Sequence, residues 1–203
     1  MALFRAIGEG GKPKTLLTML HEEGQRSRSH GLPVSVLQAQ ADSLRVPLMT
    51  RNATWDDYES VFIDALRGLK GKGIGTGVFG DIDLEEHRQW VHKVCAATDV
   101  EPIHPLWGKG RRSLLDDLLR AGFRATIVAV KERVLDESYL GRELTEKTVE
   151  DLHGEGIDVS GEAGEYHTVV TDGPIFANPI ILTHGRHYSR DSYVFLDVGI
   201  AGK

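Results

Sequence analysis

Short apolar runs alternate with amphipathic helical patterns from residue 15 to residue 130 of this 203-residue chain. An apolar run of four to seven residues suits a buried strand, whereas apolar residues spaced three and four apart suit one buried face of a helix. Strands that alternate with helices form a parallel sheet with helices packed on both faces. This part of the chain is therefore predicted to be an α/β domain built on a doubly wound parallel sheet.

Each expected element of this domain has a local signal. Asp83 and Glu86 fit a capping box that opens a helix carrying Cys95, and Gly122 is expected to end a later helix as its C-cap. One buried helical face is indicated by the spacing of Trp55, Tyr58, Phe62, Leu66 and Leu69. The expected strands cover residues 15–19, 47–50, 76–80, 103–106 and 124–130, and further helices cover residues 34–44 and 112–121.

The regular alternation of strand and helix patterns ends after residue 130, which predicts a second and smaller domain. A short helix is expected from Thr145 to Leu152, with Thr145 as its N-cap. Strand-like runs follow at residues 166–171, 179–183 and 193–198. Such a mixture is typical of an α+β domain. We place the boundary near residue 133, which gives domains of residues 1–133 and 134–203.

The loop from Gly161 to Thr168 gathers dissimilar polar groups just before a β-branched strand. Its glycines permit positive φ angles and a close approach of the backbone to a ligand. Its polar groups suit an amine, a carboxyl or a carboxamide, although a solvated turn has a similar composition. The candidate ligand-binding residues are Glu162, Gly164, Glu165, Tyr166, His167 and Thr168.

Polar groups also follow the expected parallel strands, where ligands of such sheets bind. The stretch Arg26–Gly31 has two arginines, two hydroxyl groups and a glycine, which suit a phosphate or a carboxylate. Gly80 lets a nucleotide lie against the backbone, and Asp81 suits a hydroxyl group or a metal ion. The alternatives are a solvated loop at Arg26–Gly31 and a helix cap at Asp81.

Composition and charge exclude several classes of partner and site. The net charge of −6 and the pI near 5.8 argue against a nucleic-acid binder with a broad basic face. No apolar run approaches the roughly 20 residues that span a bilayer. A single cysteine, Cys95, permits no internal disulfide, and a reducing cytoplasm is the simplest setting. His184 and His187 lack a third ligand nearby, so no metal site is predicted.

Six ordered stretches carry a family resemblance: LLTML (16–20), RSRSHGLP (26–33), GVFGDIDLEEHR (77–88), LWG (106–108), LDESYLGR (135–142) and GEAGEYHTVVTDGPIF (161–176). Together they resemble the diphthine–ammonia ligase family of N-type ATP pyrophosphatases. The resemblance covers essentially the whole chain, and the last stretch is its most distinctive part. It implies a doubly wound sheet of the adenine nucleotide alpha-hydrolase (HUP) type and a smaller α+β domain that carries the Gly-Glu-x-Gly-Glu loop.

The activity that the resemblance implies is an ATP-dependent amide ligase, which adenylates a carboxyl group and amidates it with ammonia, releasing AMP and pyrophosphate. Residues 1–133 would bind the nucleotide and residues 134–203 the acceptor, a protein or a small-molecule carboxylate. ATP implies Mg²⁺ as well. The candidate nucleotide-binding residues are Ser29, His30, Gly31, Gly80 and Asp81, and the loop residues named above would bind the acceptor or ammonium. No catalytic residue is assigned, and a homodimer is left open.

The chain departs from the family at its N-terminus. Family members open with a strand and a pyrophosphate-binding loop of the form Ser-Gly-Gly-Lys-Asp-Ser, which a helix follows. Residues 1–6 align with that helix, so we expect an N-terminally shortened version of a longer protein. The alternative function is a non-catalytic adenine-nucleotide-binding protein that has lost the phosphate loop.

Overall fold

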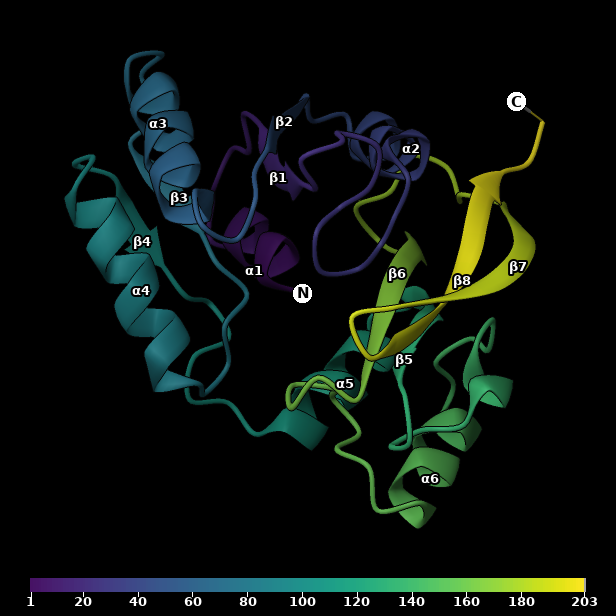
Figure 1. Ribbon diagram of the computed structural model, residues 1–203. Coiled ribbons are helices and arrows are strands. Elements are labelled where there is room, and N and C mark those ends of the chain that lie inside the picture. Colours follow the sequence, from purple (N-terminus) through teal and green to yellow (C-terminus); the bar gives the residue numbers. More distant parts are fainter. Residues whose placement is uncertain (203) are drawn as a thin grey trace. The chain divides into compact units, whose positions relative to one another are not determined.

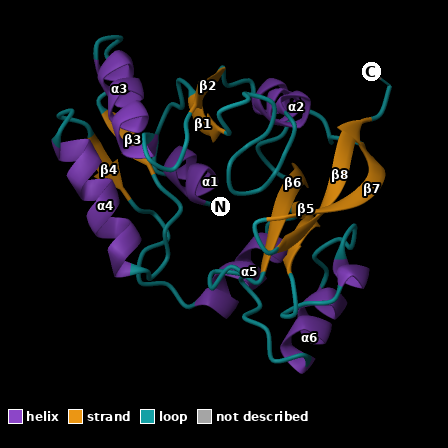
Figure 2. Ribbon diagram, viewed as in Figure 1, coloured by secondary structure: helices purple, strands orange, loops and turns teal. Residues whose placement is uncertain are grey.

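The computed structural model describes residues 1–202, and the chain divides into two compact units (Figure 1). Unit 1 comprises Met1–Gly24 and Val46–Gly110, and unit 2 comprises Gln25–Arg45 and the chain from Arg111 onward. Parallel strand pairs lie in unit 1 and a separate antiparallel sheet lies in unit 2, so the fold is mixed α/β (Figure 2). Each unit is described by itself.

The strands of unit 1 form two parallel pairs. β1 (Leu16–Leu20) pairs with β2 (Leu48–Asn52), and β3 (Thr76–Val78) pairs with β4 (Glu101–Ile103). One continuous parallel sheet was expected. It is divided here because, among the described residues, no strand pairs with the second edge of β1 or of β3.

Three helices accompany these strands: α1 (Ala2–Gly8), α3 (Tyr58–Lys70) and α4 (Glu85–Ala96). The core between α3 and α4 is built from Leu66, Val91, Val94, Cys95 and Val100, all buried. The interpretation of Cys95 as a packed hydrophobe on a helix is confirmed. Leu17 of β1 packs against the same core, which joins one strand pair to the helices.

Two local expectations in unit 1 are wrong. Trp55 precedes α3 and is 68% exposed, because the Asp57 carboxylate accepts hydrogen bonds from the backbone N–H and hydroxyl of Thr54 and closes a turn there. The helix therefore begins only at Tyr58. The capping box at Asp83 does not form either, since α4 begins one residue later, with Leu84 as an N-cap that makes no side-chain bond.

Unit 2 is built on a four-stranded sheet in the order β6–β5–β8–β7. β5 (Arg124–Lys131) runs antiparallel to both β6 (Tyr166–Asp172) and β8 (Tyr193–Ile200), and β7 (Leu182–Arg190) runs antiparallel to β8. The strand expected at residues 179–183 corresponds to β7, which begins later, at Leu182, and is longer. A two-residue turn, in which Asp191 and Ser192 both have positive φ, joins β7 to β8.

β5 was expected to belong to the parallel sheet, and this expectation is wrong. Its buried apolar run fits a central strand of either kind of sheet, so the run does not determine the direction of its neighbours. The domain boundary expected near residue 133 falls inside unit 2, because β5 on one side of it pairs with β6 and β8 on the other.

The helices of unit 2 are α2 (Val34–Leu44), α5 (Arg111–Arg120) and α6 (Glu146–Gly154), with a 3₁₀ helix η1 (Glu137–Tyr139). The prediction for α2 is confirmed. This helix is attached to the sheet of unit 2, because Gln40 donates a hydrogen bond to the carbonyl of Val170 in β6 at 2.8 Å. Gly122 follows α5 with a φ of +82°, as a C-cap requires. No helix within residues 1–202 is long and apolar enough to cross a membrane.

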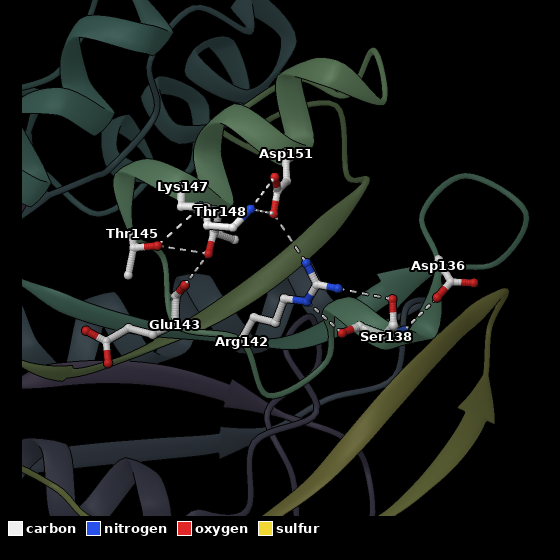
Figure 3. A network of polar contacts seen from close by, with 8 residues as sticks. All are labelled: Asp136, Ser138, Arg142, Glu143, Thr145, Lys147, Thr148 and Asp151. Atoms are coloured by element: carbon white, nitrogen blue, oxygen red, sulfur yellow. Dashed lines mark hydrogen bonds and ion pairs between the residues drawn. The ribbon is translucent and has the colours of Figure 1, made fainter.

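Arg142 braces the segment that precedes α6 (Figure 3). Its guanidinium donates to the carbonyl of Ser138 at 2.8 Å, lies 3.6 Å from a carboxylate oxygen of Asp151, and covers the ring of Tyr139. Thr145 caps α6 as predicted, since its hydroxyl accepts the backbone N–H of Thr148 (Figure 3). The LDESYLGR stretch therefore stabilises the fold around α6.

Candidate functional site

Two phenols fix the shape of the polar loop that precedes β6. Tyr166 donates its hydroxyl to the carbonyl of Val159, and Tyr193 donates to the carbonyl of Gly164, both at 2.6 Å. Gly161 and Gly164 have φ angles of +68° and +79°, in the region that favours glycine. A Cβ on Gly164 would lie 2.9 Å from the Tyr193 hydroxyl. The loop is thus held in one conformation by residues of β6 and β8.

Asp158 organises the start of this loop. Its carboxylate accepts the backbone N–H groups of Ser160 and Glu162 at 3.1 and 3.2 Å, and the Arg111 guanidinium lies 2.5 Å away. Burial by itself would raise the Asp158 pKa, but the Ser160 hydrogen bonds and Arg111 outweigh it and hold that pKa below its usual value. Asp158 remains ionised at neutral pH and stabilises the turn.

Glu165 contributes a carboxylate oxygen whose partner is missing among the described residues. Its Oε1 accepts the backbone N–H of Asp158 at 3.4 Å, whereas its Oε2 is buried and has no hydrogen-bond partner. The charges of Asp158, Glu165 and Glu162 add to burial in raising the pKa of Tyr166. The loop therefore provides a strongly negative environment that favours a cation.

A row of side chains crosses the sheet beside this loop. In register, His167 of β6 lies opposite Ala129 of β5, which lies opposite Phe195 of β8, which lies opposite Tyr188 of β7. Residues in register share one face of a sheet. Ala129 has the smallest side chain of the row and is fully buried, and Phe195 beside it is buried as well.

The loop of residues 26–33 lies over the same row. The His30 ring is 4.9 Å from the His167 ring, and Gly31 approaches Phe195 so closely that a Cβ would lie 2.7 Å from its ring. Arg26 pairs with Asp197 of β8 at 2.6 Å, so its guanidinium pins the loop to the sheet. The structure thus brings His30 and Gly31 to the face that carries His167, and Ser29 precedes them at an exposed position of the turn.

His167 is uncharged at neutral pH. Burial and, to a smaller degree, the charge of His30 lower its pKa to about 4. Its ring also stacks on Tyr193 at a centroid distance of 5.2 Å. A neutral imidazole in this position accepts or donates one hydrogen bond at each ring nitrogen without bringing a charge.

Tyr166 and Thr168, two other candidates of the loop, do not lie on the face that carries His167. Tyr166 is 4% exposed and belongs to the hydrophobic core of unit 2, so its ring holds the loop from below. Thr168 pairs with Ile127, a core residue, and alternation along β6 places it on the face opposite His167. Tyr193 and Asp158, which shape the loop, were not predicted as site residues. One signal could have found Tyr193: it stands two residues before Phe195 in an expected strand, so the two side chains lie on the same face of the sheet.

The remaining candidates, Gly80 and Asp81, lie in unit 1 at the carboxyl end of β3. One carboxylate oxygen of Asp81 is 3.5 Å from Nδ1 of His104, and the other is 3.7 Å from Nδ1 of His87. Both histidines thus lie beside the same carboxylate. Within the described part of the chain, no group of three or more His, Cys, Asp or Glu side chains has a metal-binding arrangement.

Two family models match the chain. The model described as the diphthamide synthase N-terminal domain matches residues 1–102, and the one described as the diphthamide synthase C-terminal domain matches residues 111–201. The gap between the two matches contains the change from unit 1 to unit 2 at residues 110 and 111. Both matched ranges thus agree with the unit boundary in this part of the chain.

Curated relatives carry one name, diphthine–ammonia ligase. The protein of Danio rerio is 26% identical over 174 residues, which are 83% of this chain and 68% of that relative. The protein of Mus musculus is 28% identical over 172 residues, 82% of this chain and 64% of the relative. That of Homo sapiens is 30% identical over 132 residues, 63% of this chain and 49% of the relative. The chain thus spans between about half and two thirds of these relatives.

Proposed function

The chain belongs to the diphthamide synthase family, and from that premise we propose that it is an ATP-dependent amide ligase. A carboxylate oxygen of the acceptor would attack the α-phosphorus of ATP, and pyrophosphate would leave. Ammonia would then attack the acyl carbon of the acyl-adenylate, and AMP would leave with the bonding electrons as the new amide loses a proton. AMP is a far better leaving group than hydroxide, which is the chemical reason for spending ATP.

The buried Oε2 of Glu165 is the observation that carries this proposal on the side of the acceptor and ammonia. A buried carboxylate oxygen without a partner costs free energy unless a ligand supplies a donor. Ammonium has both the charge and the N–H donors that suit it, and a cationic acceptor has the charge. Glu162, Gly164, His167 and Thr168 stay candidates for this ligand, whereas we assign Tyr166 to holding the loop, because its ring and hydroxyl are buried.

Gly80 and Asp81 are the proposed ATP-binding residues of unit 1, and Ser29, His30 and Gly31 stay candidates within unit 2. No described atom lies within 4 Å of a Cβ placed on Gly80, so its backbone suits close approach by a nucleotide, and Asp81 suits a ribose hydroxyl. Mg²⁺ would be held mainly by the phosphates of ATP, as is usual for this ion. We place the reaction in the cytoplasm, a setting consistent with the free and buried Cys95.

The complete sheet of unit 1 would be doubly wound, with a further strand between β1 and β3. Each of these strands is paired on one edge among the described residues, and both pairs are parallel. A strand followed by a Ser-Gly-Gly-Lys-Asp-Ser loop, as the family resemblance implies, would satisfy the backbone groups of both edges. Its loop would bind the ATP phosphates at a helix N-terminus.

The test is release of AMP and pyrophosphate from ATP in the presence of ammonium chloride and candidate carboxylate acceptors. It compares the chain with a version extended by the implied strand and loop. Glu165→Gln should raise the KM for ammonium about tenfold, a loss of ~1.4 kcal/mol of binding free energy. Glu150→Gln, an exposed carboxylate on α6, should leave the KM unchanged. If neither version makes AMP with any acceptor while folded, the ligase proposal fails.

The second candidate is a non-catalytic adenine-nucleotide-binding protein. It would need the candidate nucleotide-binding residues, such as Gly80 and Asp81, but no phosphate loop. Calorimetry separates the two functions, since AMP binding without ATP turnover in the extended version supports the second one. A folded chain with no affinity for AMP or ATP would overturn both.

A further inference from the structure

Asp81 lies between two imidazoles that differ in environment. His104 faces one of its carboxylate oxygens and has a side chain that is 6% exposed, whereas His87 faces the other oxygen and is 64% exposed. The Asp81 side chain is itself 19% exposed. The carboxylate therefore has one buried neighbour and one exposed neighbour.

The buried imidazole packs against three other rings. The His104 ring stacks against Phe79 of the β3 end at 5.6 Å and against His92 of α4 at 5.5 Å, with interplanar angles of 29° and 23°. Trp107 meets it edge-on at 6.1 Å. These contacts come from three segments, so the ring has little freedom to turn or to leave Asp81.

Neither ring nitrogen of His104 has a hydrogen-bond partner among the described residues, although both are buried. Nδ1 lies 3.5 Å from the Asp81 carboxylate, slightly beyond hydrogen-bond distance. A small movement of Asp81 toward Nδ1 would satisfy a buried donor, which is favourable. A ligand that moves the Asp81 carboxylate slightly toward Nδ1 would therefore complete the hydrogen bond from His104.

Burial keeps the ring neutral. Desolvation, followed by the nearby His92 and Arg88, lowers the pKa of His104, against the opposing effect of Asp81. Arg88 is in turn stacked on Trp107, 4.6 Å from the ring centroid. A neutral imidazole that donates from Nδ1 orients the carboxylate without cancelling its charge, so Asp81 keeps its full capacity to accept hydrogen bonds from a ligand.

We infer that His104 is a positioning residue for Asp81, which it orients to accept hydrogen bonds from the ribose hydroxyl groups of an adenine nucleotide. The inference rests on the proposed function, in which Asp81 binds nucleotide. It adds His104, a residue that no sequence pattern selects, because it stands alone directly after the short strand β4. It also predicts a selectivity: a nucleotide that lacks a ribose hydroxyl should be bound less well.

The test is calorimetric titration of the chain with AMP, 2′-deoxy-AMP and 3′-deoxy-AMP. His104→Phe preserves the stacking but removes the donor, and should weaken AMP binding about tenfold and abolish the preference for AMP over the deoxynucleotides. His104→Asn places an amide N–H near the position of Nδ1 and should restore most of both. His92→Phe, in the same stack but without a contact to Asp81, is the matched control and should bind like the unmodified chain.

The outcomes separate the inference from the function on which it rests. Unchanged AMP affinity and selectivity in His104→Phe, with Asp81→Asn defective, would overturn the role of His104 alone. A uniform loss for all three nucleotides, without rescue by His104→Asn, would show a structural effect and overturn it as well. Selective AMP binding without pyrophosphate release would support His104 and contradict the ligase. If the folded chain binds none of these nucleotides, both are wrong.

Discussion

At the scale of single residues, Tyr193 sets the shape of the candidate site although it lies 29 positions from the loop that it holds. Tyr193→Phe would leave the Gly164 carbonyl without its donor, and we expect unfolding to be easier by about 1–2 kcal/mol. Urea denaturation measures this change. Tyr188→Phe is the control, because the buried Tyr188 hydroxyl has no hydrogen-bond partner and its removal should cost nothing. Equal effects of the two substitutions would contradict the assignment.

A second single residue, His167, makes the free energy of unfolding depend on pH. Its pKa is about 4 when folded and should return to about 6.5 when unfolded. Between these values the unfolded chain binds a proton that the folded chain does not, so stability falls as pH is lowered from 6.5 toward 4. We expect a loss of about 2–3 kcal/mol from this group.

The measurement compares unfolding free energies at pH 7 and pH 4.5. In His167→Gln the loss over this interval should be smaller by roughly 2 kcal/mol. His153→Gln, at an exposed position near the end of α6, should behave like the unmodified chain. The idea is wrong if His167→Gln and the unmodified chain have the same pH dependence.

At the scale of elements, the N-cap of α6 shows where local sequence determines structure. Thr145 accepts the N–H of Thr148 at 3.2 Å, and its hydroxyl also lies 3.1 Å from that of Thr148. Thr145→Ala should destabilise unit 2 by about 1 kcal/mol. Thr145→Ser keeps the acceptor and should lose much less. Thermal or urea unfolding of both variants decides the matter, and similar losses in the two would exclude capping as the cause.

The same scale shows why some elements could be predicted and others could not. α2 and the Thr145 cap depend on neighbours within four residues, and both were found from the sequence. β5 was found as a buried strand, but its partners lie 36 to 66 residues later, and apolar residues do not reveal whether they run parallel to it. The capping box at Asp83 failed because several start positions of a helix compete locally at small cost.

For the candidate site, the sequence indicated the polar loop but not the direction of each side chain. Glu165 and His167 were named correctly as polar groups of the loop, yet Tyr166 between them belongs to the core. Strand alternation separates them, and it requires the start of β6 to be known within one residue. The meeting of His30 with His167 joins residues 137 positions apart in sequence, and no local pattern predicts such a contact.

At the scale of the whole molecule, the two units should differ in local stability. β5 is paired on both edges, and its residues Ile127, Ala129 and Val130 are fully buried. β3 has three residues, is paired with β4 alone among the described strands, and exposes Thr76 and Val78. Amides that are buried and paired on both sides open only when most of their unit opens, whereas those of a short, partly exposed pair open locally.

Hydrogen exchange measured by mass spectrometry tests this difference. Peptides covering residues 124–131 should exchange at least about 100-fold more slowly than those covering residues 76–78, a gap of ~2.7 kcal/mol in opening free energy. The version extended by the implied strand should protect 76–78 far more, because that strand would pair with the second edge of β3, while the protection of β5 stays the same. If β3 and β5 exchange together in the chain as it stands, then unit 1 is already as stable as unit 2. A further strand between β1 and β3 would then not be needed for its stability.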